Sequence, residues 1–275
     1  MDLSKLTYSK DSPRKTLKKA NFLPPAKRET ESKPLVNQRY IPQSYSKADG
    51  VLSPHLVFVL SGGEKRERDF LSKLIQQREI RSLRVVFMSE KQQGLQPFQM
   101  QEMWKEIQSA GKFNAKGQTY LLEAIDKVFL LSDVDEFYEQ LKKIFNDNAD
   151  AEQGQWIVSN PCFEIWLYYC FLNNPKKDLE SLESETVAKR SQKLKSLVAK
   201  LIHGGIDPRK AFEQMVSGIN NSREHYEVDT NSIPVLFATQ MHIMAQYLVE
   251  TMNQNNNEYT NHTEKIAQWR DKMKK

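Results

Sequence analysis

Short apolar runs alternate with segments of helical periodicity between residues 55 and 175. The runs are rich in residues that favour strands. Because continuously apolar strands alternating with helices are typical of a parallel sheet covered on both faces, the pattern predicts an α/β fold. The predicted strands are residues 55–60, 83–88, 127–132 and 156–159, and helices are expected over residues 97–109 and at residues 121–126.

The two ends of the chain have different patterns. Residues 1–50 contain five of the eleven prolines and no sustained apolar periodicity, which is typical of a flexible, disordered arm. Beyond residue 175 the strand signal fades, and helical periodicity appears over residues 186–202, 208–215 and 233–252. We therefore predict an arm over residues 1–50, an α/β core over residues 51–175 and a helical C-terminal extension over residues 176–275.

The net charge of +5 is unevenly distributed. Residues 1–50 contain 11 Lys or Arg and 5 Asp or Glu, whereas the rest of the chain contains 29 and 30. The basic excess belongs to the arm, where it indicates contact with phosphate or an acidic partner; a merely solvated tail is the alternative. Candidate nucleic-acid-binding residues are Lys15, Lys18 and Lys19 in the arm, with Lys65 and Arg66 after the first predicted strand.

Cysteine content and apolar run length indicate the compartment. Cys162 and Cys170 lie in an apolar stretch, as expected for buried free thiols in a reducing environment. No apolar run approaches the length that crosses a bilayer, and the N-terminus is polar and lysine-rich, unlike a signal peptide. We therefore expect a soluble cytoplasmic protein with no membrane partner.

Two aspartates, Asp133 and Asp135, directly follow the third predicted strand. Carboxylates two residues apart at a strand end can converge on one hard cation, and oxygen ligands of this kind suit Mg²⁺ or Mn²⁺. Without a cation the two negative charges would repel each other. The alternative is that both carboxylates only satisfy free N–H groups at a helix N-terminus.

Acidic residues also follow the first predicted strand. Glu64 and Glu67 come after Ser61-Gly62-Gly63, and in a parallel sheet they lie at the same edge as Asp133. Glu67 is then a candidate third metal ligand, and either glutamate is a candidate catalytic group. The alternative is the mixed-charge first turn of a surface helix. The glycines do not form a P-loop, since no Gly-Lys-Ser/Thr follows.

The fourth predicted strand leads into the string Ser159-Asn160-Pro161-Cys162-Phe163-Glu164-Ile165-Trp166. Locally it looks like a helix start, with Ser159 or Asn160 as cap, Pro161 at the first position and Glu164 one turn later. Its place at a strand end also allows Ser159, Asn160 and Glu164 to orient the metal ligands from behind.

Together these three strings resemble the RloB family, whose members occur beside restriction–modification genes and pair with an ATPase. The family pattern is Glu-Gly-x-x-Thr-Glu-x-x-Tyr-Phe after a strand, then Asp-x-Asp, then Ser-Asn-Pro-x-Phe-Glu-x-Trp. The resemblance covers roughly residues 55–250. The third string matches fully, the second matches at Asp133 and Asp135, and the first matches at Gly63 and Glu67, with Phe70 in place of the tyrosine.

The resemblance implies a Toprim-like fold, similar to the nuclease domains of OLD-type enzymes and to topoisomerase and primase domains. It further implies Mg²⁺-dependent phosphodiester chemistry with the carboxylates as metal ligands. The expected function is a nuclease that acts on DNA or RNA in defence against phage, with an ABC- or AAA-type ATPase as partner.

One departure from the family pattern bears on activity. Gly62 stands where the family has its first glutamate, a residue with a metal-binding or acid–base role in Toprim domains. A degenerate module that binds nucleic acid or the ATPase without cleavage is therefore the second hypothesis. A phosphotransferase role for Asp133 and Asp135 is disfavoured, because such pairs normally follow the first strand. Self-association through residues 233–252 stays open.

Overall fold

The computed structural model describes residues 44–45, 55–76, 83–91, 94–147, 154–202 and 205–254. All of them belong to the larger of two compact units, Pro42–Lys275. Of the predicted arm, the described part is β1 (Ser44–Tyr45), which pairs in parallel with β5 (Gln118–Leu121). The arm residues Lys15, Lys18 and Lys19 lie outside the described residues, and the domain boundaries at residues 50 and 175 stay predictions.

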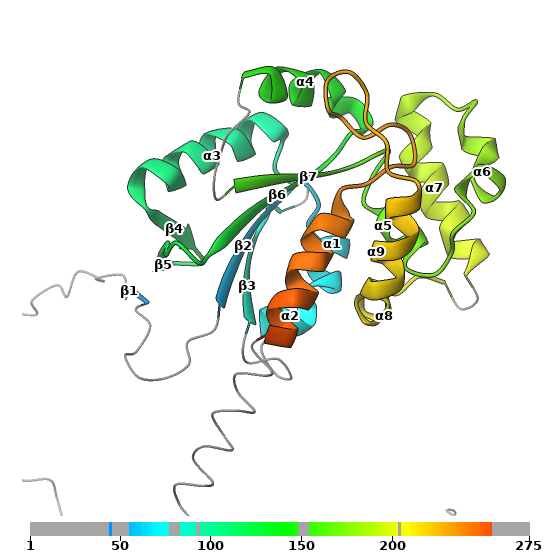
Figure 1. The fold of residues 1–275 in the computed structure, drawn as a ribbon. Helices are drawn as coiled ribbons and strands as arrows, with labels where there is room; N and C mark the ends of the chain where they lie inside the picture. The colour runs from blue at the N-terminus through cyan, green and yellow to red at the C-terminus, as the bar shows by residue number, and fades with distance from the viewer. Residues whose placement is uncertain are drawn as a thin grey trace, which may run out of the picture. The chain divides into compact units, whose positions relative to one another are not determined.

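A four-stranded parallel sheet forms the centre of the fold (Figure 1). The predicted α/β class, a parallel sheet flanked by helices, is confirmed. In spatial order the strands are β3 (Leu83–Met88), β2 (His55–Ser61), β6 (Lys127–Asp133) and β7 (Gly154–Ser159). The register pairs Ser61 with Leu131 and Asp133 with Ser159, so the carboxyl ends of β2, β6 and β7 lie together.

Helices cover both faces of this sheet, which explains why the strands are apolar without alternation. On one face, α3 (Pro97–Ala110) packs Met100 and Trp104 against Phe58 and Leu130. The amphipathic α4 (Tyr138–Asp147) adjoins α3 on this side and packs Leu141 against Val158 (Figure 1).

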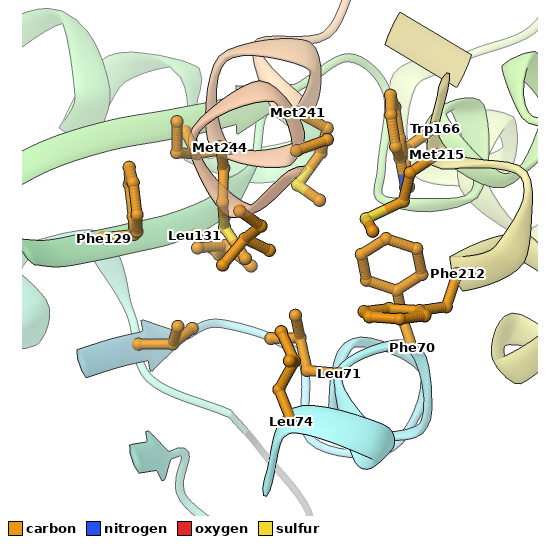
Figure 2. Close-up of a cluster of buried hydrophobic side chains, with 14 of the residues drawn as sticks. Phe70, Leu71, Leu74, Phe129, Leu131, Trp166, Phe212, Met215, Met241 and Met244 are labelled. Carbon is orange, nitrogen blue, oxygen red and sulfur yellow. The ribbon is translucent and has the colours of Figure 1, made fainter. Parts of the chain in front are cut away.

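The other face carries the larger core cluster, in which residues from distant parts of the sequence meet. Figure 2 shows Met241 and Met244, from the helix of residues 241–254, beside Leu131 of β6. Phe70, of α1 (Arg66–Phe70), packs edge-on against Phe212 of α8. The remaining elements of this face are α2 (Ser72–Gln76), α5 (Glu164–Tyr169), α8 (Pro208–Glu213) and α9 (Met215–Glu224).

A further cluster joins α5 to α7 (Val187–Leu201), whose Leu194 and Val198 are fully buried. The same cluster includes Leu179, which lies between the short helix α6 (Pro175–Asp178) and the 3-10 turn η3 (Glu180–Leu182). α7 also contacts the 3-10 turn η2 (Asp135–Phe137) at the end of β6. The sequence-distant α7 is therefore fixed beside the carboxyl ends of the strands.

Two of the predicted helices are wrong in part. Residues 121–126 do not end a helix: they begin at the last residue of an antiparallel hairpin, formed by β4 (Lys112–Ala115) and β5, and connect it to β6 without regular structure. The helix predicted over 233–252 begins only at residue 241, and residues 233–240 form an irregular segment along the edge of β7. That segment is held by an antiparallel bridge between Ser159 and Thr239. No helix among the described residues is long and apolar enough to cross a membrane.

Candidate functional site

The site lies where β2, β6 and β7 end. After β2 the chain turns at Gly62, whose N–H donates to the Leu131 carbonyl at 2.8 Å and so lies beside the end of β6. A second segment crosses over this turn: a Cβ on Gly94 would lie 1.6 Å from the Gly62 carbonyl oxygen. Glycine at position 94 is what allows the two backbones to approach this closely.

Asp133 is the last residue of β6 and lies between three other acidic side chains. Its Oδ1 accepts a hydrogen bond from the Phe163 N–H at 2.8 Å. Burial, followed by the negative charges of Glu67, Glu164 and Asp135, raises the pKa of Asp133 well above its ordinary value. Without a counter-charge, ionisation of this group is therefore costly.

Glu67 extends from α1 toward the same point and is only 7% exposed. Its carboxylate lies directly over Gly63, where a Cβ would come within 1.9 Å of Oε1. Burial and the nearby charge of Glu164 raise the pKa of Glu67 to about 7, against the lowering effect of a backbone hydrogen bond and of Lys195 and Arg66.

Glu164 opens α5 and is 3% exposed. It is ion-paired with two cations: Arg66 Nε lies 3.1 Å from Oε1, and Lys195 Nζ lies 3.9 Å from the same oxygen. Arg66 comes from α1 and Lys195 from α7, so one buried carboxylate connects the two helices.

Asp135 begins η2 and faces α7, where Ser191 donates a hydrogen bond to its Oδ1. Burial raises the pKa of Asp135, and the hydrogen bond from Ser191 and the charge of Lys195 oppose that rise. Asp135 thus joins the end of β6 to α7.

An open pocket of about 300 Å³ lies at this edge of the sheet. A smaller space of about 10 Å³, close to the size of one water, adjoins Glu67, Asp133 and Ser159. Glu67 and Asp133 line both spaces, whereas Asp135 lines neither. The side chains around the open pocket come from Glu64, Lys65, Arg66, Glu67, Asp133, Glu164 and Lys195.

The other predicted residues have the following surroundings. Glu64 reaches the open pocket and pairs with Arg68 at 3.4 Å. Ser159 Oγ lies 2.7 Å from Thr239 Oγ1, and Asn160 donates from Nδ2 to the Pro234 carbonyl at 2.7 Å. Ser159 and Asn160 thus hold the 233–240 segment against the end of β7.

The expected helix cap in this string is wrong. α5 begins at Glu164, its N-cap residue is Phe163, and no side-chain hydrogen bond caps it. The Asn160–Pro161 peptide is cis. The physical reason is the late start of the helix: a cap residue directly precedes the first helical residue, whereas Asn160 lies four residues before Glu164. Its side chain instead donates to the Pro234 carbonyl.

Sequence reasoning missed Lys195 and Ser191. They lie one turn apart on α7 and both reach the site. Nothing in the sequence separates Lys195 from the other basic residues of α7, which are Lys189, Arg190, Lys193 and Lys200.

The carboxylates of the site fit a hydrated metal ion better than an ion that is enclosed by protein ligands. Among the described residues, no three His, Cys, Asp or Glu side chains are gathered closely enough to enclose a cation. Mg²⁺ does not need such a cage, because it usually keeps several waters and relies on one or two carboxylates. Glu67 and Asp133, which face the same space and repel each other, fit a hydrated Mg²⁺ or Mn²⁺.

Comparison with known proteins agrees with the resemblance seen in the motifs. Searches of curated proteins and of solved structures found no match. The family model described as RloB-like protein matches residues 57–267, which include every site residue described above and most of the chain. The chain therefore belongs to the RloB-like family.

Proposed function

We propose that the protein is a divalent-metal-dependent nuclease of the Toprim type. The observation that carries this proposal is that Glu67 of α1 and Asp133 at the end of β6 line one pocket together with Arg66 and Lys195. Acidic groups for a metal and basic groups for a phosphate are the two requirements of phosphodiester hydrolysis by this chemistry. A role in defence against phage, with an ATPase partner, follows from the family resemblance and is part of the proposal.

The residues of the pocket have distinct roles in this proposal. Glu67 and Asp133 would hold Mg²⁺ or Mn²⁺, and the ion would supply Lewis-acid stabilisation of negative charge on a phosphate and would lower the pKa of a bound water. Burial raises the pKa values of both carboxyl groups, and a bound cation would favour their ionised forms. Asp135 and Ser191 hold the end of β6 against α7, and the Phe163 N–H orients Asp133.

A second candidate is a module that binds nucleic acid or the ATPase without cleaving. Gly62 favours this second candidate, because the family's glutamate is absent here and the backbone leaves little space for a side chain at position 62. A Cβ at position 62 would lie 3.3 Å from the Leu95 carbonyl oxygen and 3.4 Å from that of Leu131. A glutamate there would need the Leu95 segment to shift, so restoring it by substitution is a poor test of activity.

A cleavage assay separates the two candidates. The protein, alone and with its ATPase partner, is incubated with plasmid, single-stranded DNA and RNA in Mg²⁺, Mn²⁺ or EDTA. Under the nuclease proposal, cleavage needs the metal, is lost in Asp133→Asn and persists in Glu136→Gln. Glu136 is an exposed acidic residue of η2, three residues after the end of β6. Absence of cleavage in every condition, with nucleic-acid binding intact, would favour the binding module.

A further inference from the structure

We propose that Arg66 and Lys195, which are both ion-paired with Glu164, form a phosphate-binding pair in the pocket. This pair binds the phosphates of the nucleic-acid backbone. The pair deepens the nuclease proposal, on which it rests for the class of ligand. Its members come from α1 and from α7, in the predicted C-terminal extension.

The geometry indicates a built site because buried carboxylates and partly exposed cations line one pocket. Glu67 and Asp133 provide the acidic part, and Arg66 and Lys195 meet at Glu164. The pocket lining contains four carboxylates and three cations, so its formal charge is −1 and would become +1 with a divalent ion bound. A bound divalent ion would offset the acidic part, and the cations then favour an anion beside it.

Exposure supports a role beyond structure. The side chain of Glu164 is 4% exposed, whereas those of Arg66 and Lys195 are 39% and 45% exposed. All three residues line the open pocket, and the two cations are much more exposed than the carboxylate that they pair with. Arg66 pairs with Glu164 through Nε, so its two terminal nitrogens are not used in this ion pair. A guanidinium in this arrangement can still bind a phosphate through a planar fork.

Lys195 is also held in a defined place. Leu194 and Val198 anchor α7 in the core, and Ser191, one turn before Lys195, binds Asp135 at the end of β6. Burial alone would lower the pKa of Lys195, but the charges of Glu164, Asp133 and Asp135 raise it overall, so the amine stays protonated. Lys200 is exposed on the same helix and does not line the pocket.

The chemistry that this pair recognises is the phosphodiester backbone, because an ammonium and a guanidinium read phosphate and not base identity. Such contacts are weakened by salt in proportion to the number of phosphates neutralised. A free phosphate or a mononucleotide offers the same chemistry, and competition distinguishes these sources from a polynucleotide.

The test measures binding of the full-length protein to a labelled 12-nucleotide DNA and RNA over a range of salt concentrations, in Ca²⁺, a hard cation that carboxylate oxygens bind and that offsets the acidic part of the pocket. Lys195→Gln and Arg66→Gln should each weaken binding by about tenfold at low salt and reduce the salt slope by about one. Lys195→Arg should restore binding, and Lys200→Gln should bind as the wild type does. Thermal melting of each variant checks that the fold is intact.

Two results would overturn the pair. The first is binding by Lys195→Gln equal to that of Lys200→Gln. The second is displacement of the oligonucleotide by inorganic phosphate or a nucleoside monophosphate at the oligonucleotide's own concentration, since this would make the site one for free phosphate. The assay needs no cleavage, so loss of the nuclease proposal leaves the pair testable. Conversely, the nuclease proposal would stand and the phosphate-binding pair would be wrong if the protein showed metal-dependent cleavage while Lys195→Gln bound the oligonucleotide as the wild type does.

Discussion

At the residue scale, Gly63 determines where the Glu67 carboxylate lies. A Cβ at position 63 would come within 1.9 Å of Glu67 Oε1, a flexible side-chain end that can move away. Gly63→Ala should therefore cost at most about 1 kcal/mol of stability. It should displace the carboxylate from the pocket and reduce metal-dependent cleavage by about a hundredfold, a loss that a displacement of about 1 Å can cause. Single-turnover cleavage and chemical denaturation measure the two effects.

The double variant Gly63→Ala/Glu67→Gln is the control for this prediction. If the alanine acts only through Glu67, the double variant should cleave no more slowly than Glu67→Gln alone. Additive losses would show that Gly63 acts by another route.

At the element scale, the strands of the sheet were predictable and several connections were not. Residues 55–60 form a continuous apolar run because both faces of β2 are buried, with Phe58 on one side and Val59 on the other. β5 has only four residues, and Tyr120 is the buried one. The strand is therefore too short to show an alternation of apolar and polar positions in the sequence. Ile233 and Phe237 have helical spacing, yet they pack into different clusters from an irregular segment.

Some residues of the candidate site were likewise predictable from the sequence, and others were not. Asp133 and Glu67 were predictable because strand ends in a parallel sheet gather at one edge. Lys195 was not, because its role depends on how α7 packs against η2 and on no feature of its local sequence. Long-range packing determines where such a residue lies in three dimensions, and the pattern of apolar residues along the sequence does not contain this information.

The crossing of two backbone segments at Gly94 gives a stability prediction for the loop after β3. Gly94 has a φ of +70°, and a Cβ there would lie 1.6 Å from the Gly62 carbonyl oxygen, a backbone atom that cannot move aside cheaply. Gly94→Ala should therefore destabilise the protein by about 3 kcal/mol or more. Gly111→Ala is the matched control, since Gly111 has a φ of +60° with no atom within 4 Å of the added Cβ.

Urea denaturation measures both variants. Gly111→Ala should lose only the cost of the left-handed backbone, about 1 kcal/mol. Equal losses in the two variants would mean that the close approach of Gly94 to Gly62 is not a constraint on the fold.

At the scale of the whole molecule, the site is assembled from segments that are far apart in the sequence. α1 contributes Glu67 and Arg66, the end of β6 contributes Asp133, α5 contributes Glu164 and α7 contributes Lys195. The core cluster in Figure 2 joins the sheet to helices as late in the chain as residues 241–254. Truncation within that helix would therefore expose the core beside the site as well as shorten the chain.

The central claim, that Glu67 and Asp133 bind a divalent metal, is tested most directly by titrating Mn²⁺ into the metal-free protein by calorimetry. At pH 8 the wild type and Glu136→Gln should give the same saturable binding, and Asp133→Asn should give none. Binding should weaken at pH 6, because the pKa of Glu67 is raised to about 7 in the metal-free protein and its proton then competes with the metal. Undiminished Mn²⁺ binding by Asp133→Asn would contradict the assignment of this edge of the sheet as the metal site.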